Sequence, residues 1–252
     1  MPQSLRTSDI AQIVGVHANT VRLYEEKGFL PPIPRSPTGY RLFTPLHLEQ
    51  MRLAHLALQG PYSGSPQVVI HLVKCAAEGD LGMAMEWAYE YLAQVRMERT
   101  RAEAALEFLE RWARGQVLEI TKRPLTIGQA AVHLGVTMDQ LYNWDRNGLL
   151  SVPRDPQTGY RLYGASEIGR LRVIRMLRQS GYSLMSILRM LRYFDTGETE
   201  QLRQVLDTPS EDEVIQTVAD RWLTTLTNQE KRAQDIIQQI TVMMNTAFSS
   251  PD

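Results

Sequence analysis

The sequence predicts a mainly α-helical fold with small β wings, in which a winged helix-turn-helix unit occurs twice and each copy is followed by a long helix. The pentapeptide Thr-Gly-Tyr-Arg-Leu at residues 38–42 returns at residues 158–162, 120 positions later. After each copy, apolar residues recur at intervals of three and four over a long stretch, as they do along one face of a helix. These observations favour two small domains of one kind over a single large one.

The same offset of 120, with no gap, pairs residues on both sides of the pentapeptide. The pairs are Leu5 with Leu125, Ala11 with Ala131, Gly15 with Gly135, Gly28 with Gly148, Leu30 with Leu150 and Arg52 with Arg172. A chance pentapeptide match would not bring the flanking glycines along in register. A unit of roughly 60 residues is therefore duplicated.

The composition is that of an ordinary globular protein, with 43% hydrophobic and 22% charged residues in a chain of 252. No apolar run approaches the ~20 residues of a membrane span, and the N-terminus lacks a signal pattern. The lone cysteine, Cys75, excludes an intrachain disulfide and a Cys-rich metal site. No phosphate loop or nucleophile motif is found, so we expect no enzyme, no metal and no cofactor.

Charge alternates along the chain. Residues 1–60 carry 6 basic and 4 acidic side chains, and residues 121–195 carry 11 and 5. The tracts that follow them are acidic, with 6 basic and 9 acidic residues over 61–120 and 4 and 10 over 196–252. This alternation predicts two surfaces that meet an anion, each followed by a segment that does not.

In the first copy, two short helices joined at Gly15 predict a helix-turn-helix, with the second helix running from about Ala18 to Lys27. The prolines that follow forbid a helix, and Thr38-Gly39 predicts the turn of a two-stranded wing. Thr44-Pro45 has the cap and first-turn proline of a further helix. In the second copy the equivalent helix runs from Met138 to Asn147 and the wing from Leu149 to Tyr163.

The long helices are expected over 81–114 and 209–247, and their apolar stripes predict that they pair as an antiparallel coiled coil. The full division has six parts. Residues 1–60 are the first winged helix-turn-helix domain (head one), 61–80 a connecting helix, 81–114 a long helix and 115–124 a linker. Residues 125–195 are the second winged helix-turn-helix domain (head two), and 196–248 are the C-terminal long helix.

These residues resemble the MerR family of bacterial transcription regulators. Head two carries most of the family's DNA-binding pattern in order, from residues 125–131 through 147–150 and 159–163 to 177–184. Head one carries Thr-Val-Arg-Leu-Tyr at 20–24 and Gly-Tyr-Arg at 39–41, both typical of the family. The resemblance implies a winged helix-turn-helix followed by a long dimerisation helix. Members usually carry one such copy per chain, so the duplication is a departure.

In head one, the second helix should enter the major groove while the wing follows the backbone. Arg22 has the guanidinium fork for a phosphate or a guanine edge, and we expect it to have most influence on site choice. The remaining expected DNA contacts are Thr20, Tyr24, Arg35, Tyr40 and Arg41. Two alternatives stay open: Tyr40 can pack the wing onto the core, and Tyr24 can be a core residue.

Head two departs at the recognition helix, where Tyr142 stands for Arg22 and Trp144 for Tyr24. A tyrosine cannot make the bidentate guanine contact, whereas an indole N–H can still donate to phosphate. The expected DNA contacts of head two are Tyr142, Trp144, Arg154, Tyr160 and Arg161. Two alternatives stay open for head two: it reads a different half-site, or it relies more on contacts to the DNA backbone.

In the family, two protomers pair through antiparallel long helices, and each helix ends near the partner's DNA-binding domain. We expect one chain of this protein to hold both halves as a monomeric pseudo-dimer; the alternative is a homodimer with four heads. Its expected partners are double-stranded DNA and RNA polymerase at a bipartite promoter, in the cytoplasm and associated with the nucleoid. A small-molecule effector stays open.

Two other functions stay open. One is a small-molecule sensor or drug-sequestering protein, with Trp87, Tyr91 and Trp222 as a candidate aromatic pocket in the helical layer. The other is an architectural protein that binds DNA without switching.

Overall fold

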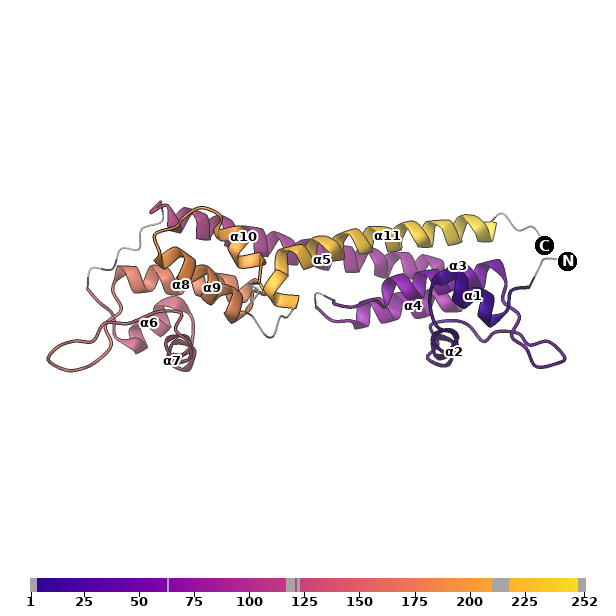
Figure 1. Ribbon diagram of the computed structural model, residues 1–252, viewed down its shortest axis with the longest axis horizontal. Coiled ribbons are helices and arrows are strands. Elements are labelled where there is room, and N and C mark those ends of the chain that lie inside the picture. Colours follow the sequence, from indigo (N-terminus) through magenta and orange to yellow (C-terminus); the bar gives the residue numbers. More distant parts are fainter. Residues whose placement is uncertain (1–3, 63, 117–120, 122, 210–217, 249–252) are drawn as a thin grey trace. The chain divides into compact units, whose positions relative to one another are not determined.

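The computed structural model describes residues 4–62, 64–116, 121, 123–209 and 218–248 (Figure 1). Within them it has eleven α-helices and one 3₁₀-helix. Head one contains α1 (Thr7–Val14), α2 (Ala18–Glu26) and α3 (Pro45–Ala57), which are followed by α4 (Gln67–Glu78) and α5 (Leu81–Ala113). Head two contains α6 (Ile127–Leu134), α7 (Met138–Arg146), α8 (Ala165–Gln179) and α9 (Leu184–Asp195). The chain ends with α10 (Leu202–Asp207), η1 (Val218–Arg221) and α11 (Trp222–Phe248).

The chain divides into two compact units, each of which is described here by itself. Unit 1 is formed by residues 1–97 and 226–252, and unit 2 by residues 98–225. The boundary falls within both long helices, so α5 and α11 each contribute a stretch to both units. No helix among the described residues is both long enough and apolar enough to cross a membrane.

The helix-turn-helix of head one forms where the sequence predicts it. Gly15 takes a left-handed conformation with φ of 76°, and the amide of Val16 donates to the carbonyl of Ala11, which closes the turn. The buried side chains of α1, α2, α3 and the wing make one core: Ile10, Ala11, Val21, Leu30, Ile33, Phe43 and Met51. This core fixes how α2 is presented to the outside.

The beginning of α3 is capped as predicted. The amide of His47 donates to Thr44 Oγ1 at 3.3 Å, and the amide of Thr44 donates to His47 Nδ1 at 3.1 Å. Pro45 occupies the first helical position, where its missing N–H has no intrahelical partner to lose.

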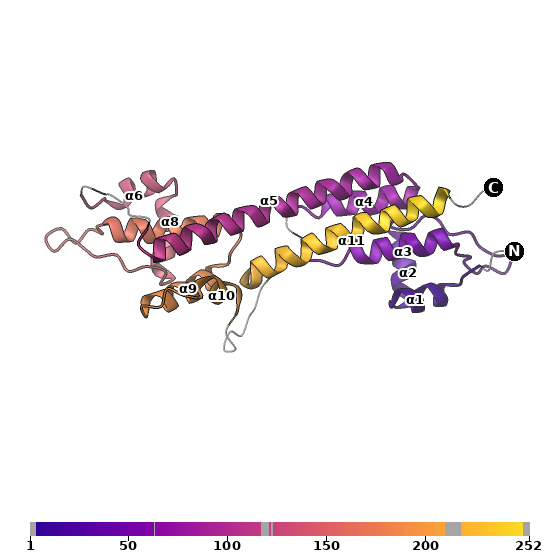
Figure 2. The same cartoon turned by 90° about the horizontal axis from the view of Figure 1, so that it is seen from above.

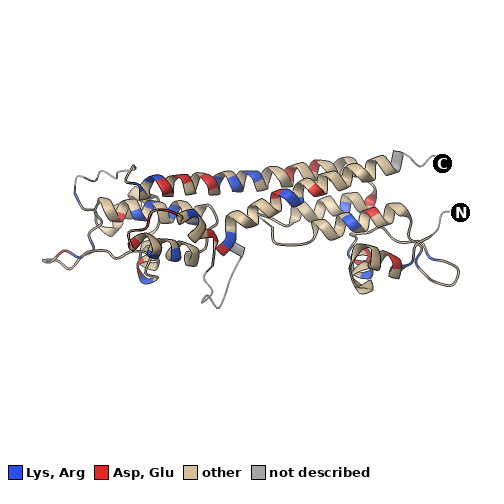
Figure 3. Cartoon of the chain, turned by 45° about the horizontal axis from the view of Figure 1, so that its top comes forward, with Lys and Arg blue, Asp and Glu red and all other residues tan. Residues whose placement is uncertain are grey.

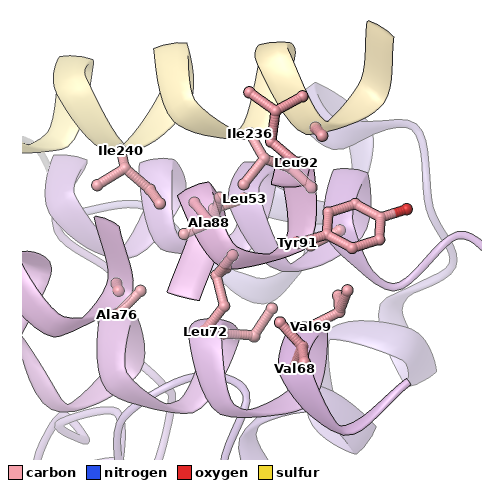
Figure 4. Packing of buried hydrophobic residues seen from close by; sticks show 14 of the residues in the cluster. Leu53, Val68, Val69, Leu72, Ala76, Ala88, Tyr91, Leu92, Ile236 and Ile240 are labelled. Atoms are coloured by element: carbon pink, nitrogen blue, oxygen red, sulfur yellow. The ribbon is translucent and has the colours of Figure 1, made fainter. Parts of the chain in front are cut away.

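A second core in unit 1 joins α3, α4, α5 and α11 (Figure 4). Leu72 and Val69 of α4 lie on one side of α5, toward Ala88 and Tyr91, while Leu92 lies beside Ile236 of α11. Each fully buried side chain of this size stabilises the fold by about 1.5–3 kcal/mol.

Within unit 1 the two long helices run in opposite directions. Arg96 pairs with Glu230 at 2.9 Å, and Tyr91 accepts a hydrogen bond from Arg232 at 3.0 Å. Because the earlier residue of α5 meets the later residue of α11, the helices are antiparallel there (Figure 2). The predicted contact between the long helices is confirmed. Charges of both signs follow one another along α5 (Figure 3), which is typical of a helix with a solvated face.

Unit 2 repeats the plan of head one. Thr126 and Gln129 form the predicted capping box of α6, in which the Thr126 amide donates to Gln129 Oε1 at 3.0 Å. Gly135 takes φ of 62° at the turn into α7. The end of α5 packs on this head through Trp112, whose ring lies 4.6 Å from that of Phe194 and fills the space beside Gly169.

The start of α11 is held in the same unit. Its first residue, Trp222, donates from Nε1 to the carbonyl of Ser180 at 2.5 Å and covers Gly181. Asp207, at the end of α10, accepts from the Leu223 amide at 2.9 Å and from Thr224 Oγ1 at 2.5 Å, so it caps the new helix.

The predicted boundaries of the C-terminal helix are wrong at the start. The helix begins at Trp222 rather than at Pro209, after the 3₁₀ turn of η1 and the short helix α10, which was not predicted. Five of the ten residues of the expected linker 115–124 lie outside the described residues, and so do residues 210–217 of the expected helix.

The wings are loops with isolated β-bridges rather than two-stranded ribbons, so the predicted strands are wrong. Among the described residues, pairing is limited to Arg35 with Arg41 and Arg154 with Arg161, together with one bridge at the base of each wing. Head one has prolines at 31, 32, 34 and 37, and each removes an amide that a ladder would need. Few backbone hydrogen bonds therefore set the shape of each wing.

The wings also differ in register, which the gap-free offset of 120 conceals. Leu42 donates to the carbonyl of Pro34, whereas its counterpart Leu162 donates to Pro153, one position short of the offset. At the wing tip, the amide of Gly39 donates to the carbonyl of Ser36 in head one, and the amide of Gly159 donates to the carbonyl of Asp155 in head two. Compared with head one, head two therefore has one residue fewer before the wing and one more at its tip.

Candidate nucleic-acid interface

The recognition helix α2 presents Arg22 to the outside. This side chain is exposed, and its guanidinium donates to Asn19 Oδ1 at 3.0 Å, one turn earlier on the same helix. Thr20 lies on the flank of α2 and is half-buried. The contact with Asn19 orients the Arg22 fork while leaving donors unused, as a base-reading arginine requires.

Tyr24 is partly a packing residue. It is half-buried, its ring stands edge-on to Phe29 at 5.8 Å, and burial raises its pKa. Both cores of unit 1 touch it. Its hydroxyl is the group that we expect to bind a phosphate.

The wing arginine of head one is tied to the recognition helix. Arg41 pairs with Glu25 of α2 at 2.5 Å, and both side chains are mostly buried. The second oxygen of Glu25 accepts from the Ile33 amide at 3.1 Å. One carboxylate thus fastens both sides of the wing to the helix that is expected to enter the groove.

Head two repeats this tie. Arg161 donates to Asp145 of α7 from Nε at 2.9 Å and from Nη2 at 2.6 Å, and its guanidinium lies 5.3 Å from the centre of the Tyr142 ring. Asp145 is Glu25 displaced by 120 positions. Sequence reasoning treated the two arginines as DNA contacts and missed their partners, although the acidic residue repeats at the same offset.

The other wing residues are near the tip. Arg35 and Arg154 are exposed, and each donates to the carbonyl of the tip glycine, at 3.5 and 3.0 Å. Tyr40 and Tyr160 are 65% and 72% exposed, so packing of Tyr40 onto the core is excluded. The Arg6 guanidinium lies 5.9 Å from the Tyr40 ring centre.

Four of the five residues expected to bind DNA in head two come together. Tyr142, Arg154, Tyr160 and Arg161 line one groove of about 340 Å³. Gly159 and the start of α6, with Thr126, Ile127 and Gly128, complete the lining. The amides of a first helical turn lack intrahelical partners and can bind an anion, and here two arginines line the same groove.

Trp144, the fifth expected contact, is buried instead. Only 5% of its surface is exposed, and the part that is exposed lines an open groove with Asp139 and Asn143. The apolar ring packs where the smaller Tyr24 packs in head one, because the tertiary core accepts the larger side chain.

The wing tips carry different chemistry. In head one, Ser36 Oγ meets Thr38 Oγ1 at 2.8 Å and accepts from the Tyr40 amide at 3.1 Å. In head two, Asp155 accepts from the amides of Gln157 and Thr158 at 2.9 and 2.7 Å. These hydrogen bonds to the charged form lower the pKa of Asp155, so its tip carries a negative charge.

Part of the basic excess of head two is internal. Several arginines bind acceptors of their own unit: Arg161 to Asp145, Arg170 to Asp195, Arg175 to the carbonyl of Leu134, Arg178 to that of Tyr182 and Arg189 to that of Val205. Residue counts therefore overstate the charge that this head offers to an anion.

The three rings of the candidate aromatic pocket have different surroundings. Tyr91 is 1% exposed and belongs to the core of unit 1, where the half-buried Trp87 packs against the His71 ring at 5.3 Å. Trp222 is half-buried in unit 2, where its Nε1 donates to the carbonyl of Ser180. Packing and this hydrogen bond account for the three rings, and a pocket lined by all three stays a prediction.

Comparison with protein families finds two matches in this chain. The model of the MerR family regulatory protein matches residues 6–43, and that of the MerR HTH family regulatory protein matches residues 125–193. Each match contains the recognition helix of one head. The predicted duplication of a MerR-type unit is confirmed, and these families are described as regulatory proteins, not as enzymes.

Curated relatives agree with this. The HTH-type transcriptional regulator CueR of Escherichia coli O6:H1 is 42% identical over 55 residues, which is 22% of this chain and 41% of the relative. The mercuric resistance operon regulatory protein of Serratia marcescens is 34% identical over 77 residues, which is 31% of this chain and 54% of the relative. The nodulation protein NolA of Bradyrhizobium sp. (strain NC92) is 36% identical over 70 residues, which is 28% of this chain and 30% of the relative. The chain thus spans about half or less of the length of these relatives, and no solved structure matches it.

Proposed function

We propose that this chain is a MerR-type regulator, because residues 6–43 and 125–193 both match MerR family models. It regulates transcription by binding a bipartite promoter element with two unequal heads. In this proposal one chain does the work of a dimer. Its partners are double-stranded DNA and the RNA polymerase at that promoter.

The observation that carries the proposal is the composition of the two compact units. Unit 1 joins head one to α11, the helix that follows head two in the sequence. Unit 2 joins head two to the second half of α5, the helix that follows head one.

Specific contacts support this exchange of helices. Gln239 of α11 donates to Glu49 Oε2 of head one at 2.7 Å. Ser180 of head two donates to the carbonyl of Arg101 in α5 at 3.2 Å. In a family member with one copy per chain, such contacts would join two protomers, and here a single chain provides both sides.

The DNA-binding residues of each head follow from its exposed cations. In head one these are Arg22 for base reading and Arg35 for the backbone, with Thr20, Tyr24 and Tyr40 as hydroxyl donors. In head two, Tyr142, Arg154 and Tyr160 line the groove that takes a phosphate. Arg41 and Arg161 act chiefly by holding each wing to its recognition helix.

The regulatory step proposed for the pair of heads is distortion of the DNA between two half-sites. Smooth bending of a site of 20–30 base pairs costs on the order of 1–6 kcal/mol, which contacts from both heads offset. A distorted spacer changes how the two promoter boxes face the polymerase.

Sedimentation tests the pseudo-dimer. The chain should sediment as a monomer of 28.7 kDa at micromolar concentration, and should bind one bipartite site per chain. A stable dimer under these conditions would replace the proposal with a homodimer of four heads.

Selection of bound sites from random DNA tests the function itself. We expect enrichment of two different half-sites at one spacing, with affinity that falls steeply as salt rises. Tight binding without sequence preference would instead identify an architectural protein.

A further inference from the structure

The two recognition helices offer opposite chemistry at their first turns. In head one, Asn19 accepts a hydrogen bond from Arg22, so the pair presents the donors of a guanidinium. In head two, the same positions hold Asp139 and Tyr142. We propose that Asp139 determines the sequence specificity of head two by accepting a hydrogen bond from the N4 amino group of a cytosine, which rests on the proposed function.

The first argument is the position of Asp139. It is the second residue of α7, and it is exposed. The N-terminal residues of a recognition helix are those that reach base edges in the major groove. Asn143, one turn later on the same face, is exposed as well.

The second argument is that the carboxylate is available to accept a hydrogen bond from DNA. Asp139 makes no hydrogen bond or ion pair with any residue that the structure describes. The other carboxylates of head two are engaged, since Asp145 holds Arg161 and Asp155 holds its wing tip. Asp139 lines an open groove of about 490 Å³ together with Gln140, Asn143 and Arg178.

The third argument is electrostatic. An unpaired carboxylate at a DNA surface is repelled by the phosphates, so binding there requires a compensating donor. The donors on major-groove base edges are the N4 amino group of cytosine and the N6 amino group of adenine. Aspartate and glutamate suit cytosine, whereas adenine suits the combined donor and acceptor of an amide.

A purely helical role makes a different prediction. An acidic residue in the first turn interacts favourably with the helix dipole. If that were the whole role of Asp139, its replacement would lower stability and shift affinity equally for all sequences. Direct reading changes the preference at one base position only.

The experiment compares sites selected from random DNA by the full-length chain and by three variants. Asp139→Asn is the test, and Asp155→Asn is the matched control, because it removes the same charge from the same head while its amide oxygen still accepts the tip hydrogen bonds. Arg22→Gln identifies the half-site of head one, so that the remaining half-site belongs to head two. Affinities are then measured for all four bases at the selected position.

We expect the wild-type chain to prefer cytosine at one position of the head-two half-site by about tenfold. Asp139→Asn should lose this preference and favour adenine there, leaving the other half-site unchanged. Asp155→Asn should alter affinity equally for all bases.

Two results would overturn the inference alone: an unchanged cytosine preference in Asp139→Asn, or a change in that variant that is uniform across bases. A wild-type chain that enriches no site would overturn the proposed function, and this inference with it.

Discussion

The wing arginine of each copy is paired with a carboxylate on the recognition helix, Glu25 for Arg41 and Asp145 for Arg161. A charge-assisted hydrogen bond between mostly buried groups is stronger than one on an open surface. The ion pair can therefore hold the position of a wing that has few backbone hydrogen bonds of its own. The cost is a guanidinium with fewer donors left for DNA.

Glu25→Gln tests this role. The change removes one negative charge from the face that is expected to bind DNA. The side-chain oxygen of glutamine can still accept a hydrogen bond from the Ile33 amide. We expect specific affinity to fall about tenfold despite the more favourable charge, because the wing is no longer held by a charged partner. Binding is measured by titration with the selected site.

The control for this prediction is Glu26→Gln, the same charge change at the next, exposed residue of α2. It should strengthen binding slightly. An equal gain in both variants would show that the pair with Arg41 contributes nothing to binding, and a larger gain in Glu25→Gln would show that the released Arg41 contacts DNA.

Among the elements, α3 depends on a neutral histidine. Burial lowers the pKa of His47 from its usual 6.5, and its Nδ1 accepts from the Thr44 amide. The unfolded chain then binds the proton more readily than the folded one. The stabilisation is complete above pH 6.5 and is lost as pH falls through the lower folded pKa.

We therefore expect His47→Gln to reduce the pH dependence of stability. Glutamine keeps the acceptor of a capping box but does not titrate. Melting temperatures between about pH 7.5 and pH 5 should fall less in this variant than in the wild type. The control is His71→Gln, which removes an exposed histidine of α4 and should keep the wild-type slope; equal slopes in all three proteins would contradict the assignment.

The start of α11 depends on the absence of a side chain at Gly181. This glycine has φ of 99°, and an added Cβ would lie 2.5 Å from the Trp222 ring. Gly197, with φ of 91°, has nothing within 4 Å of that position. An alanine at either position would adopt the same unfavourable positive φ, but only at position 181 would its Cβ clash with a neighbouring side chain.

Gly181→Ala should therefore destabilise unit 2 by about 2 kcal/mol more than Gly197→Ala does. Urea unfolding followed by the fluorescence of the tryptophans measures the difference. Equal losses in the two variants would mean that the indole moves aside without cost and does not fix the start of α11.

At the scale of the whole molecule, one chain supplies two heads and both long helices. If the heads are held at one separation, binding depends on the rotational phase of the half-sites. Insertion of about five base pairs, half a turn of DNA, should weaken binding at least tenfold, and insertion of about ten should weaken it less. Affinity that does not change with spacing would indicate heads on a loose tether.

Much of the local structure was predictable. The bounds of α2, α5 and α7 agree with the prediction within one residue, because the 3.6-residue period and the glycine stops are local signals. The start of α11 was not, since the residue that caps it, Asp207, lies 16 positions before Leu223 in the sequence. The prediction of strands in the wings was wrong because an alternating pattern of side chains does not guarantee a neighbouring segment whose amides can donate to it.

The site was predictable in composition but not in detail. Tyr142, Arg154, Tyr160 and Arg161 share one groove, as residues repeated on equivalent elements should. The burial of Trp144 was not predicted, because the exposure of a helical position depends on what packs over it. The partners of Arg41 and Arg161 lie 16 residues away in sequence, which no local pattern reveals.

By itself the sequence determined that this protein has two MerR-type units, that each is followed by a long helix, and that the heads differ at their recognition helices. Repeats, turns and helical periods are written in neighbouring residues, so they can be read without coordinates. Only the tertiary structure decided that head one packs with α11 and head two with the end of α5, and that the wing arginines pair with carboxylates. Contacts between residues far apart in the chain depend on how apolar faces are buried together, and that is settled by the packing of the whole unit.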